Sequence, residues 1–351
     1  MHTFVCSTRL YFGENALQAL ESLGAKRVFL VTDPFFTKNG TAEQIVSHLP
    51  DSQVQIFDQI RGEPTLSLVA EGVRRLHETE ADTVLALGGG SAIDCAKGIL
   101  SLSQSAARLI AIPTTSGTGS EVTSFAILTH EGVKHPLIEE NIRPQAAILD
   151  DSLLRGLPRG LIADAGMDVL AHCLEAIAAK NASAFTTAFA SAAFRMVLEC
   201  LAASYQGDLS VRGEIHQAAT MAGLAFDNAG LGICHALSHA LGGAFHLAHG
   251  RLNAILLPHV LRFNAQAVPV PYAALASFCG LAGPNGLVFA IRRLRRRLEL
   301  PASLTAAGLE RGDVLAKADS LCRAALEDPC AASNPRPVTL EDLHSLLQAA
   351  L

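Results

Sequence analysis

The residues best suited to bind a divalent metal ion lie in the second half of the sequence. Asp168 and His172 are four residues apart and so share one face of a helix, and His235 and His239 repeat that spacing. Both pairs lie in largely apolar segments, where an imidazole without a partner is costly to bury. One carboxylate with several imidazoles is a ligand set for Fe²⁺ or Zn²⁺. The pattern predicts a metal site, with a hydrogen-bonded histidine core as the alternative.

Spacing alone does not identify the remaining ligand. His239, His246 and His249 all lie in the run CHALSHALGGAFHLAHG at 234–250. If one helix continued through this run, His246 would stay on the face that carries His239, so helical periodicity favours His246.

Two loops rich in glycine and hydroxyl groups indicate a nucleotide site. The segment LGGGSAID at 87–94 follows a predicted strand and opens a helix, whose first N–H groups and dipole attract phosphate. It is not the G-x-G-x-x-G fingerprint, and a plain strand-to-helix turn is the alternative. The segment PTTSGTGS at 113–120 also follows a predicted strand. Two such loops on one sheet predict a crevice at the carboxyl ends of the strands, where open α/β sheets bind ligands.

Asp33 ends the first clear predicted strand. A carboxylate at this position accepts hydrogen bonds from ribose hydroxyls and repels a 2′-phosphate, which favours NAD over NADP. The alternative is a turn residue that precedes Pro34.

The elements that must position these residues change in type near Pro158. Before it, short apolar runs alternate with helical stretches, which is typical of a mostly parallel sheet covered by helices, and after it only helical patterns follow. We expect an α/β dinucleotide-binding domain at 1–157 and an all-α metal-binding and catalytic domain at 158–351. Strands are predicted at 27–32, 53–57, 83–87, 108–112 and 146–149, and helices at 14–23, 42–49, 66–78, 161–180, 184–205, 212–228, 231–248 and 254–264.

Composition restricts the class of protein. Half of the 351 residues are hydrophobic, which supports a large core, and the formal net charge of −6 offers no electrostatic footprint for nucleic acid or an anionic membrane. No uncharged apolar run approaches the ~20 residues that span a bilayer, and the N-terminus lacks a signal-peptide core. The eight cysteines include no C-x-x-C pair and are interpreted as reduced core residues of a cytoplasmic protein. The basic run RRLRRR at 292–297 is interpreted as a solvated helix face, with a phosphate or partner contact as the alternative.

Four motifs, taken in order, resemble the iron-containing (group III) alcohol dehydrogenase family over nearly the whole chain. They are GGGS-x-x-D at 88–94, PTTSGTGSEVT at 113–123, GMD-x-x-x-H at 166–172 and GLGICHALSHALGGAFHLAHG at 230–250. The nearest likeness is to alcohol dehydrogenases of ethanolamine- or propanediol-utilising systems. The resemblance implies a dehydroquinate-synthase-like fold with the active site in the cleft between its two domains. The segment at 101–107 is shorter than in many relatives, which leaves the substrate range open.

The resemblance also implies roles for individual residues. It replaces His246 by His249 as the last metal ligand and places His239 beside the substrate as a proton relay. The implied metal ligands are Asp168, His172, His235 and His249, and the implied dinucleotide contacts are Asp33, Gly89, Gly90, Ser91, Asp94, Thr114, Thr115, Thr118 and Lys134. The implied cofactors are NAD and Fe²⁺, with Zn²⁺ as the alternative metal. The implied assembly is a homodimer or a larger homo-oligomer.

The predicted function is hydride transfer between NAD(H) and a small primary alcohol or aldehyde whose oxygen is activated by the metal. Maleylacetate-reductase-like and glycerol-dehydrogenase-like reactions are the alternatives within the oxidoreductases. A dehydroquinate-synthase-like lyase would need basic residues around the metal, and only Lys180 and Arg251 lie near the ligand helices. A non-catalytic binding protein would have lost a ligand, whereas all four positions are filled. The expected location is the cytoplasm, with a bacterial microcompartment as the alternative.

Overall fold

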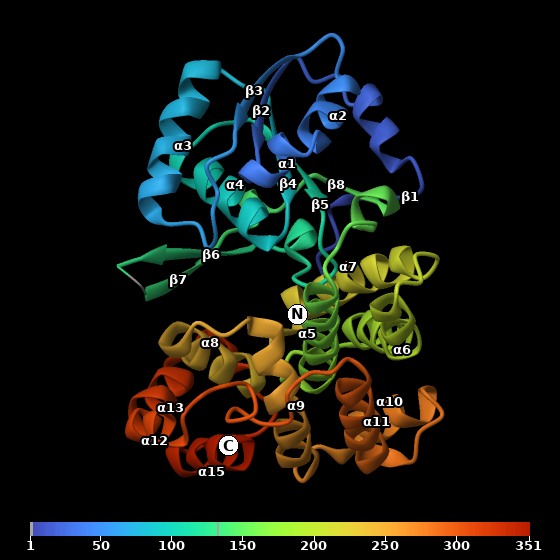
Figure 1. Ribbon diagram of the computed structural model, residues 1–351, viewed down its shortest axis with the longest axis vertical. Helices are drawn as coiled ribbons and strands as arrows, with labels where there is room; N and C mark the ends of the chain where they lie inside the picture. The colour runs from blue at the N-terminus through green and yellow to red at the C-terminus, as the bar shows by residue number, and fades with distance from the viewer. Residues whose placement is uncertain (1–2, 132) are drawn as a thin grey trace. The chain divides into compact units, whose positions relative to one another are not determined.

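The computed structural model describes residues 3–131 and 133–351, which form two compact units (Figure 1). One unit is Val5–Leu157, and the other is Pro158–Leu351 together with Phe4 from the start of the chain. All strands of the described residues belong to the first unit, and the second is built from helices. The predicted fold class, an α/β nucleotide-binding half followed by an all-α half, is confirmed.

The first unit is built on a six-stranded parallel sheet. Its central strands are apolar because helices cover both faces, so successive side chains are buried whichever way they point. In spatial order the strands are β1 (Arg9–Gly13), β8 (Ala146–Asp150), β5 (Arg108–Pro113), β4 (Thr83–Gly88), β2 (Arg27–Val31) and β3 (Gln53–Phe57). The chain passes from β2 to β3 on one side and returns to β4 on the other. The topological switch point, where ligands of such sheets bind, therefore lies between β2 and β4.

Neighbouring residues of β2 belong to two separate hydrophobic cores. Phe29 packs with residues of α3 (Leu66–Thr79) and α4 (Gly90–Ser103) on one face, and Leu30 packs with residues of η1 (Ala16–Ser22) and α2 (Thr41–Ser47) on the other. The helices of this unit are η1 (Ala16–Ser22), α1 (Pro34–Lys38), α2 (Thr41–Ser47), α3 (Leu66–Thr79), α4 (Gly90–Ser103), η2 (Ser120–Val122), η3 (Glu140–Ile142) and η4 (Asp151–Leu154).

Three strands were not predicted. β1 is a short edge strand without a fully buried residue, so its sequence lacks the apolar run that marks the central strands. β6 (Phe125–His130) and β7 (Val133–Ile138) form a separate antiparallel hairpin whose Leu128 packs into the core beside α4.

The second unit contains α5 (Arg159–Ala178; Figure 1), and most of the residues of this helix are buried. It packs against α6 (Ala184–Gln206), α7 (Arg212–Ala229) and α9 (His249–Ala265). The other helices are α8 (Ile233–Phe245), α10 (Pro269–Phe278), α11 (Gly283–Arg297), α12 (Arg311–Ala316), α13 (Ala318–Glu327), α14 (Pro329–Ala332) and α15 (Leu340–Ala350).

By length and composition alone, α6 could cross a membrane. Its sequence is not an uncharged run, because α6 contains Arg195 and Glu199, which pair with each other at 2.9 Å. A core helix passes the same test, and α6 packs against both α5 and α7.

Candidate metal centre and dinucleotide-binding loops

One face of α5 supplies three ionisable side chains. Asp168, His172 and Glu175 follow one another at i, i+4 and i+7, a spacing that aligns them along a single helix face. All three are buried. Ionisable groups buried in this way require partners from neighbouring helices, which α8 and α9 provide.

A helix break separates the histidines of α8 from His249. His246 adopts a left-handed backbone conformation (φ 57°) that ends α8, and Ala248 is extended before α9 begins at His249. The single helix predicted over 231–248 is therefore wrong in its last residues, and the periodicity argument for His246 fails with it. His246 is exposed, whereas the Nε2 atom of His249 lies 3.4 Å from the Asp168 carboxylate.

Gly250 permits a close approach of α9 to α5. A Cβ atom at Gly250 would lie 2.0 Å from the carbonyl oxygen of Asp164, so only glycine fits at this contact. The next residue, Arg251, donates from Nη2 to the Asp164 carboxylate at 3.0 Å. The start of α9 is thereby fixed one helical turn from Asp168.

Three imidazole nitrogens converge on one carboxylate oxygen. The distance from Asp168 Oδ1 to Nε2 is 3.9 Å for His172, 3.5 Å for His235 and 3.4 Å for His249. Metal–ligand bonds of 2.0–2.1 Å place the ligand atoms of a tetrahedral ion roughly 3.3 Å apart. The ligand atoms of Asp168, His235 and His249 lie within 4.8 Å of one another and suit Fe²⁺ or Zn²⁺, whereas His172 lies outside this group and would have to move closer to bind the same ion.

Glu175 orients His235 from the side opposite the metal position. Its Oε2 accepts a hydrogen bond from Nδ1 of His235 at 2.6 Å, and its two oxygens also accept the backbone N–H groups of Gly232 and Cys234 at 2.9 and 2.6 Å. Nε2 of His235 is then the nitrogen that faces Asp168, at 3.5 Å from its Oδ1. This is the carboxylate–histidine arrangement that commonly supports a metal ligand.

Asn253 connects the ligands from α9. Its Nδ2 donates to Asp168 Oδ1 at 2.6 Å and lies 3.0 Å from His249 Nε2 and 3.3 Å from His235 Nε2. The hydroxyl of Ser238 donates to Oδ1 of the same amide at 2.5 Å, which fixes which end of the amide faces the centre. Asn253 is fully buried and holds the Asp168 carboxylate in place.

The charges in the centre depend on one another. Burial raises the pKa of Asp168, but the neighbouring His172, His249 and His235 lower it by more, so the carboxylate stays ionised. Burial lowers the pKa of His235, whereas its bonds to Asp168 and Glu175 raise it to about 9. Burial lowers the pKa of His249, which keeps a lone pair on that imidazole. Two buried carboxylates around His235 thus create a site that favours a cation.

His239 lies beside the centre. Its ring stacks on that of His249 with the centroids 5.1 Å apart, and its Nδ1 lies 2.8 Å from Oδ2 of Asp328. The other Asp328 oxygen accepts the backbone N–H of Cys330 at 2.8 Å at the start of α14, so the carboxylate is held in place. With its Nδ1 proton directed at Asp328, His239 keeps Nε2 as a proton acceptor. Cys330 joins these two residues in a second cluster of metal-ligand types, but the hydrogen bond already uses the facing atoms of His239 and Asp328.

In the α/β unit, the glycine-rich and threonine-rich loops pack against each other. They follow β4 and β5, which are adjacent in the sheet. A Cβ atom at Gly89 would lie 3.2 Å from Oγ1 of Thr115, and one at Gly90 would lie 2.8 Å from Cγ2 of Thr118. Glycine therefore allows the threonine hydroxyls to lie beside the N-terminus of α4, where backbone N–H groups attract phosphate.

Asp33 lies at the switch point between β2 and β4. Its Oδ1 accepts the N–H of Phe35 at 2.7 Å, and a Cβ built on Gly88 would be 3.9 Å from its Oδ2. The N–H of Thr114 donates to the Gly88 carbonyl at 3.0 Å, and Ser91 lies in the first turn of α4. Asp33, Ser91 and Thr114 therefore lie just beyond the carboxyl ends of β2, β4 and β5. The switch point between β2 and β4 lies at the same edge of the sheet.

Two residues predicted on the dinucleotide side have protein partners. Asp94 is half-buried, and its carboxylate accepts the hydroxyl of Ser120 at 2.6 Å and the N–H of Ile127 at 3.1 Å. It thereby ties α4 to the segment that follows the threonine-rich loop. Lys134, on β7, forms an ion pair with Glu63.

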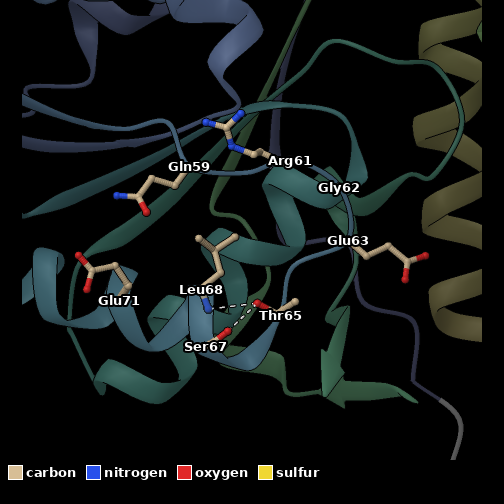
Figure 2. Close-up of a pocket in the computed structure, with 8 residues that line it drawn as sticks. All are labelled: Gln59, Arg61, Gly62, Glu63, Thr65, Ser67, Leu68 and Glu71. Atoms are coloured by element: carbon tan, nitrogen blue, oxygen red, sulfur yellow. Dashed lines mark hydrogen bonds between the residues drawn. The ribbon is translucent and has the colours of Figure 1, made fainter. Parts of the chain in front are cut away.

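Glu63 also lines a hollow of about 560 Å³ at the start of α3 (Figure 2). The hydroxyl of Thr65 accepts the N–H of Leu68 at 3.2 Å there and caps α3 (Figure 2). The other lining residues are Gln59, Arg61, Gly62, Ser67 and Glu71. None of the predicted dinucleotide contacts lines the hollow. Among the described residues, the link between the two groups is the ion pair of Glu63 with Lys134.

Three residues of the metal centre were not predicted. Glu175 had a sequence signal, because it continues the helix face of Asp168 three residues beyond His172. Asn253 follows His249 by one helical turn, but an asparagine in a helix does not by itself indicate a site. Asp328 is 89 positions from His239, and no spacing rule connects them.

Comparisons with known proteins cover both halves of the chain. Residues 7–151 match the family model described as iron-containing alcohol dehydrogenase, and residues 162–351 match the C-terminal model of the same family. The 1-propanol dehydrogenase PduQ of Salmonella typhimurium is 39% identical over 370 residues, which cover 100% of each chain. The NAD-dependent methanol dehydrogenase of Bacillus methanolicus is 34% identical over 362 residues, 95% of this chain and 94% of that relative.

The structure leads to the same family. The iron-containing alcohol dehydrogenase from Thermococcus thioreducens matches with a TM-score of 0.95 over 99% of each chain, at 30% identity. The donor set around Asp168 fits the metal for which that family is named. The chain belongs to the iron-containing alcohol dehydrogenase family and is a metal-dependent, NAD-linked alcohol dehydrogenase.

Proposed function

We propose that this enzyme interconverts small primary alcohols and their aldehydes, and that Asp168, His172, His235 and His249 hold its metal ion. The observation that carries the proposal is the convergence of three Nε2 atoms within 3.9 Å of one Asp168 oxygen. A bound divalent ion supplies Lewis-acid activation of the substrate oxygen, and the nicotinamide exchanges a hydride with the substrate carbon. The relatives named for 1-propanol and methanol support a short-chain alcohol as substrate.

Two buried residues, Glu175 and Asn253, hold the proposed metal ligands in position. Glu175 fixes the tautomer of His235, and Asn253 fixes the Asp168 carboxylate. Preorganised ligands avoid a reorganisation cost when metal and substrate bind. Because Glu175 and Asn253 are buried, they act through the ligands and do not touch the substrate.

His239 is the group that we assign to proton transfer. Its side chain is 22% exposed, unlike that of the neighbouring ligand His235 at 2%, so it is open to solvent. Asp328 holds the Nδ1 proton and leaves Nε2 to accept the hydroxyl proton during alcohol oxidation. In aldehyde reduction the same nitrogen returns the proton.

The dinucleotide is proposed to bind at the switch point of the parallel sheet. Gly89, Gly90, Ser91, Thr114, Thr115 and Thr118 form the phosphate side, and Asp33 offers Oδ2 to the ribose hydroxyls. Asp94 is proposed to support dinucleotide binding without touching the cofactor, because its two carboxylate oxygens accept hydrogen bonds from Ser120 and Ile127. Lys134 is proposed to reach the cofactor only after it leaves Glu63.

The arrangement disfavours a lyase that handles a phosphorylated or polyhydroxylated acid. Such a site needs free cations near the metal. Arg251 is committed to Asp164, and Lys180 donates to the carbonyl of Ala332. Maleylacetate, which would be reduced, and glycerol, which would be oxidised, remain the alternative substrates of an oxidoreductase with this site.

Elemental analysis combined with an NADH-oxidation assay over C2–C4 aldehydes tests the proposed function. One metal ion per chain and turnover of a short aldehyde are expected. Metal-free protein with full activity, or turnover of maleylacetate or glycerol alone, would contradict it. We also propose a homodimer or larger homo-oligomer in the cytoplasm or a bacterial microcompartment, and light scattering after size exclusion measures the oligomer.

A further inference from the structure

The basic run at 292–297 is not a uniformly solvated helix face. On α11, Arg293, Arg296 and Arg297 are exposed, but Arg295 is only 8% exposed and Arg292 is half-buried. Arg292 and Arg295 are three residues apart and share a helix face. Helix α11 lies beside α9 in the helical unit (Figure 1). The solvated-face interpretation therefore holds for only part of the run.

Arg295 contacts α9 at a carbonyl group that a proline leaves without its helical donor. Pro258 lies inside α9 and has no N–H, so the carbonyl of Ala254 lacks its usual i+4 partner. Nη1 of Arg295 lies 3.4 Å from that oxygen. This long hydrogen bond places Arg295 against α9 but occupies only one of the five guanidinium donors.

Two further side chains from α9 complete a cluster. His259 and Arg262 are three residues apart on α9, and the electrostatic field at His259 comes from Arg292, Arg295 and Arg262. Burial and these guanidiniums lower the pKa of His259 to about 4, so the imidazole is neutral near pH 7. We call His259, Arg262, Arg292 and Arg295 the α9–α11 basic cluster. Within residues 3–131 and 133–351, no carboxylate is among the charges that shift the pKa of His259, Arg292 or Arg295.

The cluster contains a buried donor without an acceptor. Nε of Arg292 is buried and makes no hydrogen bond to the described residues. A buried guanidinium nitrogen left in this state is costly, and the three guanidiniums also repel one another. The favourable dipole at the C-terminus of α11 accounts for Arg296 and Arg297 but not for Arg292, which lies more than a turn earlier.

We propose that the α9–α11 basic cluster binds a divalent oxyanion of the phosphate class, either a free ion or a phosphate ester. Guanidinium forks match the oxygen spacing of such anions, and Nε of Arg292 would gain its missing acceptor. Neutral His259 would donate one N–H. The cluster is made by α9 and α11 alone, and none of its four residues belongs to the metal centre or to the dinucleotide loops.

Sulfate is the first probe, because it carries two charges throughout the neutral pH range and binds iron weakly. Isothermal titration calorimetry is performed on the metal-loaded enzyme with saturating NAD⁺, so that the dinucleotide site is filled, and at constant ionic strength. We expect one saturable sulfate per chain. Arg292→Gln and Arg262→Gln should each weaken it by about 10-fold or more, the effect of one lost charge-assisted hydrogen bond.

Arg293→Gln is the matched control, because it removes the same charge from the exposed face of α11. Absence of saturable binding to the wild-type enzyme, or equal weakening by Arg293→Gln, would overturn the proposal. Arg262 is exposed, so Arg262→Gln carries the test if Arg292→Gln does not fold. Titrations with inorganic phosphate and with a phosphate monoester then distinguish a free ion from an ester as the preferred ligand.

Discussion

The carboxylate of Glu175 lies 2.6 Å from Nδ1 of His235 and also accepts two backbone N–H groups at the start of α8. One buried side chain of α5 therefore contacts both the start of α8 and the ring of His235, the proposed metal ligand on α8. The bond also sets which imidazole nitrogen faces Asp168, because Nδ1 is held on the Glu175 side.

Glu175→Gln should weaken metal binding by about 10–100-fold, the range measured for outer carboxylate partners of ligand histidines. Glutamine can still accept a backbone N–H, but it lacks the charge that holds the Nδ1 proton of His235. Competition with a chelator of known affinity measures the change. Glu341→Gln, an exposed change on α15, is the control, and an unchanged affinity in Glu175→Gln would reduce Glu175 to a helix cap.

His249→Ala should remove most of the bound metal, whereas His246→Ala should retain it. His249 Nε2 lies 3.4 Å from Asp168 Oδ1, and His246 is an exposed residue in the break between two helices. Elemental analysis of both variants decides the assignment. Metal loss in His246→Ala with retention in His249→Ala would contradict the proposed ligand set.

His239→Ala should lower kcat for alcohol oxidation by roughly 10²-fold, the low end of the range for a lost acid–base group. Metal content should be unchanged, and the loss should shrink at high pH, where solvent takes the proton unaided. Asp328→Asn should lower kcat less, because His239 remains but its Nδ1 partner no longer carries a charge.

The outcomes for His239 separate three roles. Loss of metal in His239→Ala would make it a ligand, and a raised KM with unchanged kcat would make it a substrate-positioning group. Wild-type kinetics would leave it as a packed helix residue. Asp328→Asn with a defect as large as that of His239→Ala would indicate that the carboxylate controls the helix start at Cys330 as well as the imidazole.

The wild-type enzyme should prefer NAD to NADP, and Asp33→Gly should narrow or invert that preference. Asp33 Oδ1 is engaged by Phe35, which leaves Oδ2 beside the glycine-rich loop to bind the ribose or repel a 2′-phosphate. The ratio of kcat/KM for the two cofactors measures it. A wild-type preference for NADP would show that Asp33 serves only as the cap of α1.

His259 should make the protein less stable as the pH falls. Its folded-state pKa is about 4, below the ordinary value of 6.5, because of burial and the nearby arginines. The unfolded chain therefore takes up a proton first, and the contribution of His259 to stability is present above pH 6.5 and lost as the pH falls towards 4.

Urea unfolding near pH 7 and near pH 5, without sulfate, tests this dependence. The unfolding free energy of His259→Gln should fall less between the two pH values than that of the wild-type enzyme. His77→Gln, on an exposed face of α3, should behave like the wild type. Parallel pH dependence in all three proteins would show that His259 is not a neutral buried group.

The sequence predicted best where one physical pattern dominates. The five predicted strands agree with β2, β3, β4, β5 and β8 to within one residue at each end, since helices on both faces of a parallel sheet leave little but apolar residues in its strands. β1 and the β6–β7 hairpin lie at the edge of that sheet or outside it and lack the pattern. Asp168 and His172 were visible from helical spacing alone.

The features that could not be predicted from the sequence depend on contacts between segments that are distant along the chain. The left-handed conformation of His246, which splits the histidine run into two helices, is not encoded by hydrophobic periodicity. The pairing of Asp328 with His239 depends on how the last helices pack against α8. The partial burial of the arginine run likewise depends on the packing of α11 against α9, where Arg295 lies near the Ala254 carbonyl that Pro258 leaves without its helical donor.

Because of the break between α8 and α9, limited proteolysis should measure the fraction of enzyme molecules that contain metal. His235 precedes the break and His249 follows it, while the intervening His246 and Ala248 are exposed. If His235 and His249 bind one ion, as we propose, that ion would connect the two helices across the exposed segment. Limited digestion should therefore cut the chelator-stripped enzyme at 246–248 well before the loaded enzyme, and the fraction cut gives the share of molecules that lack the ion.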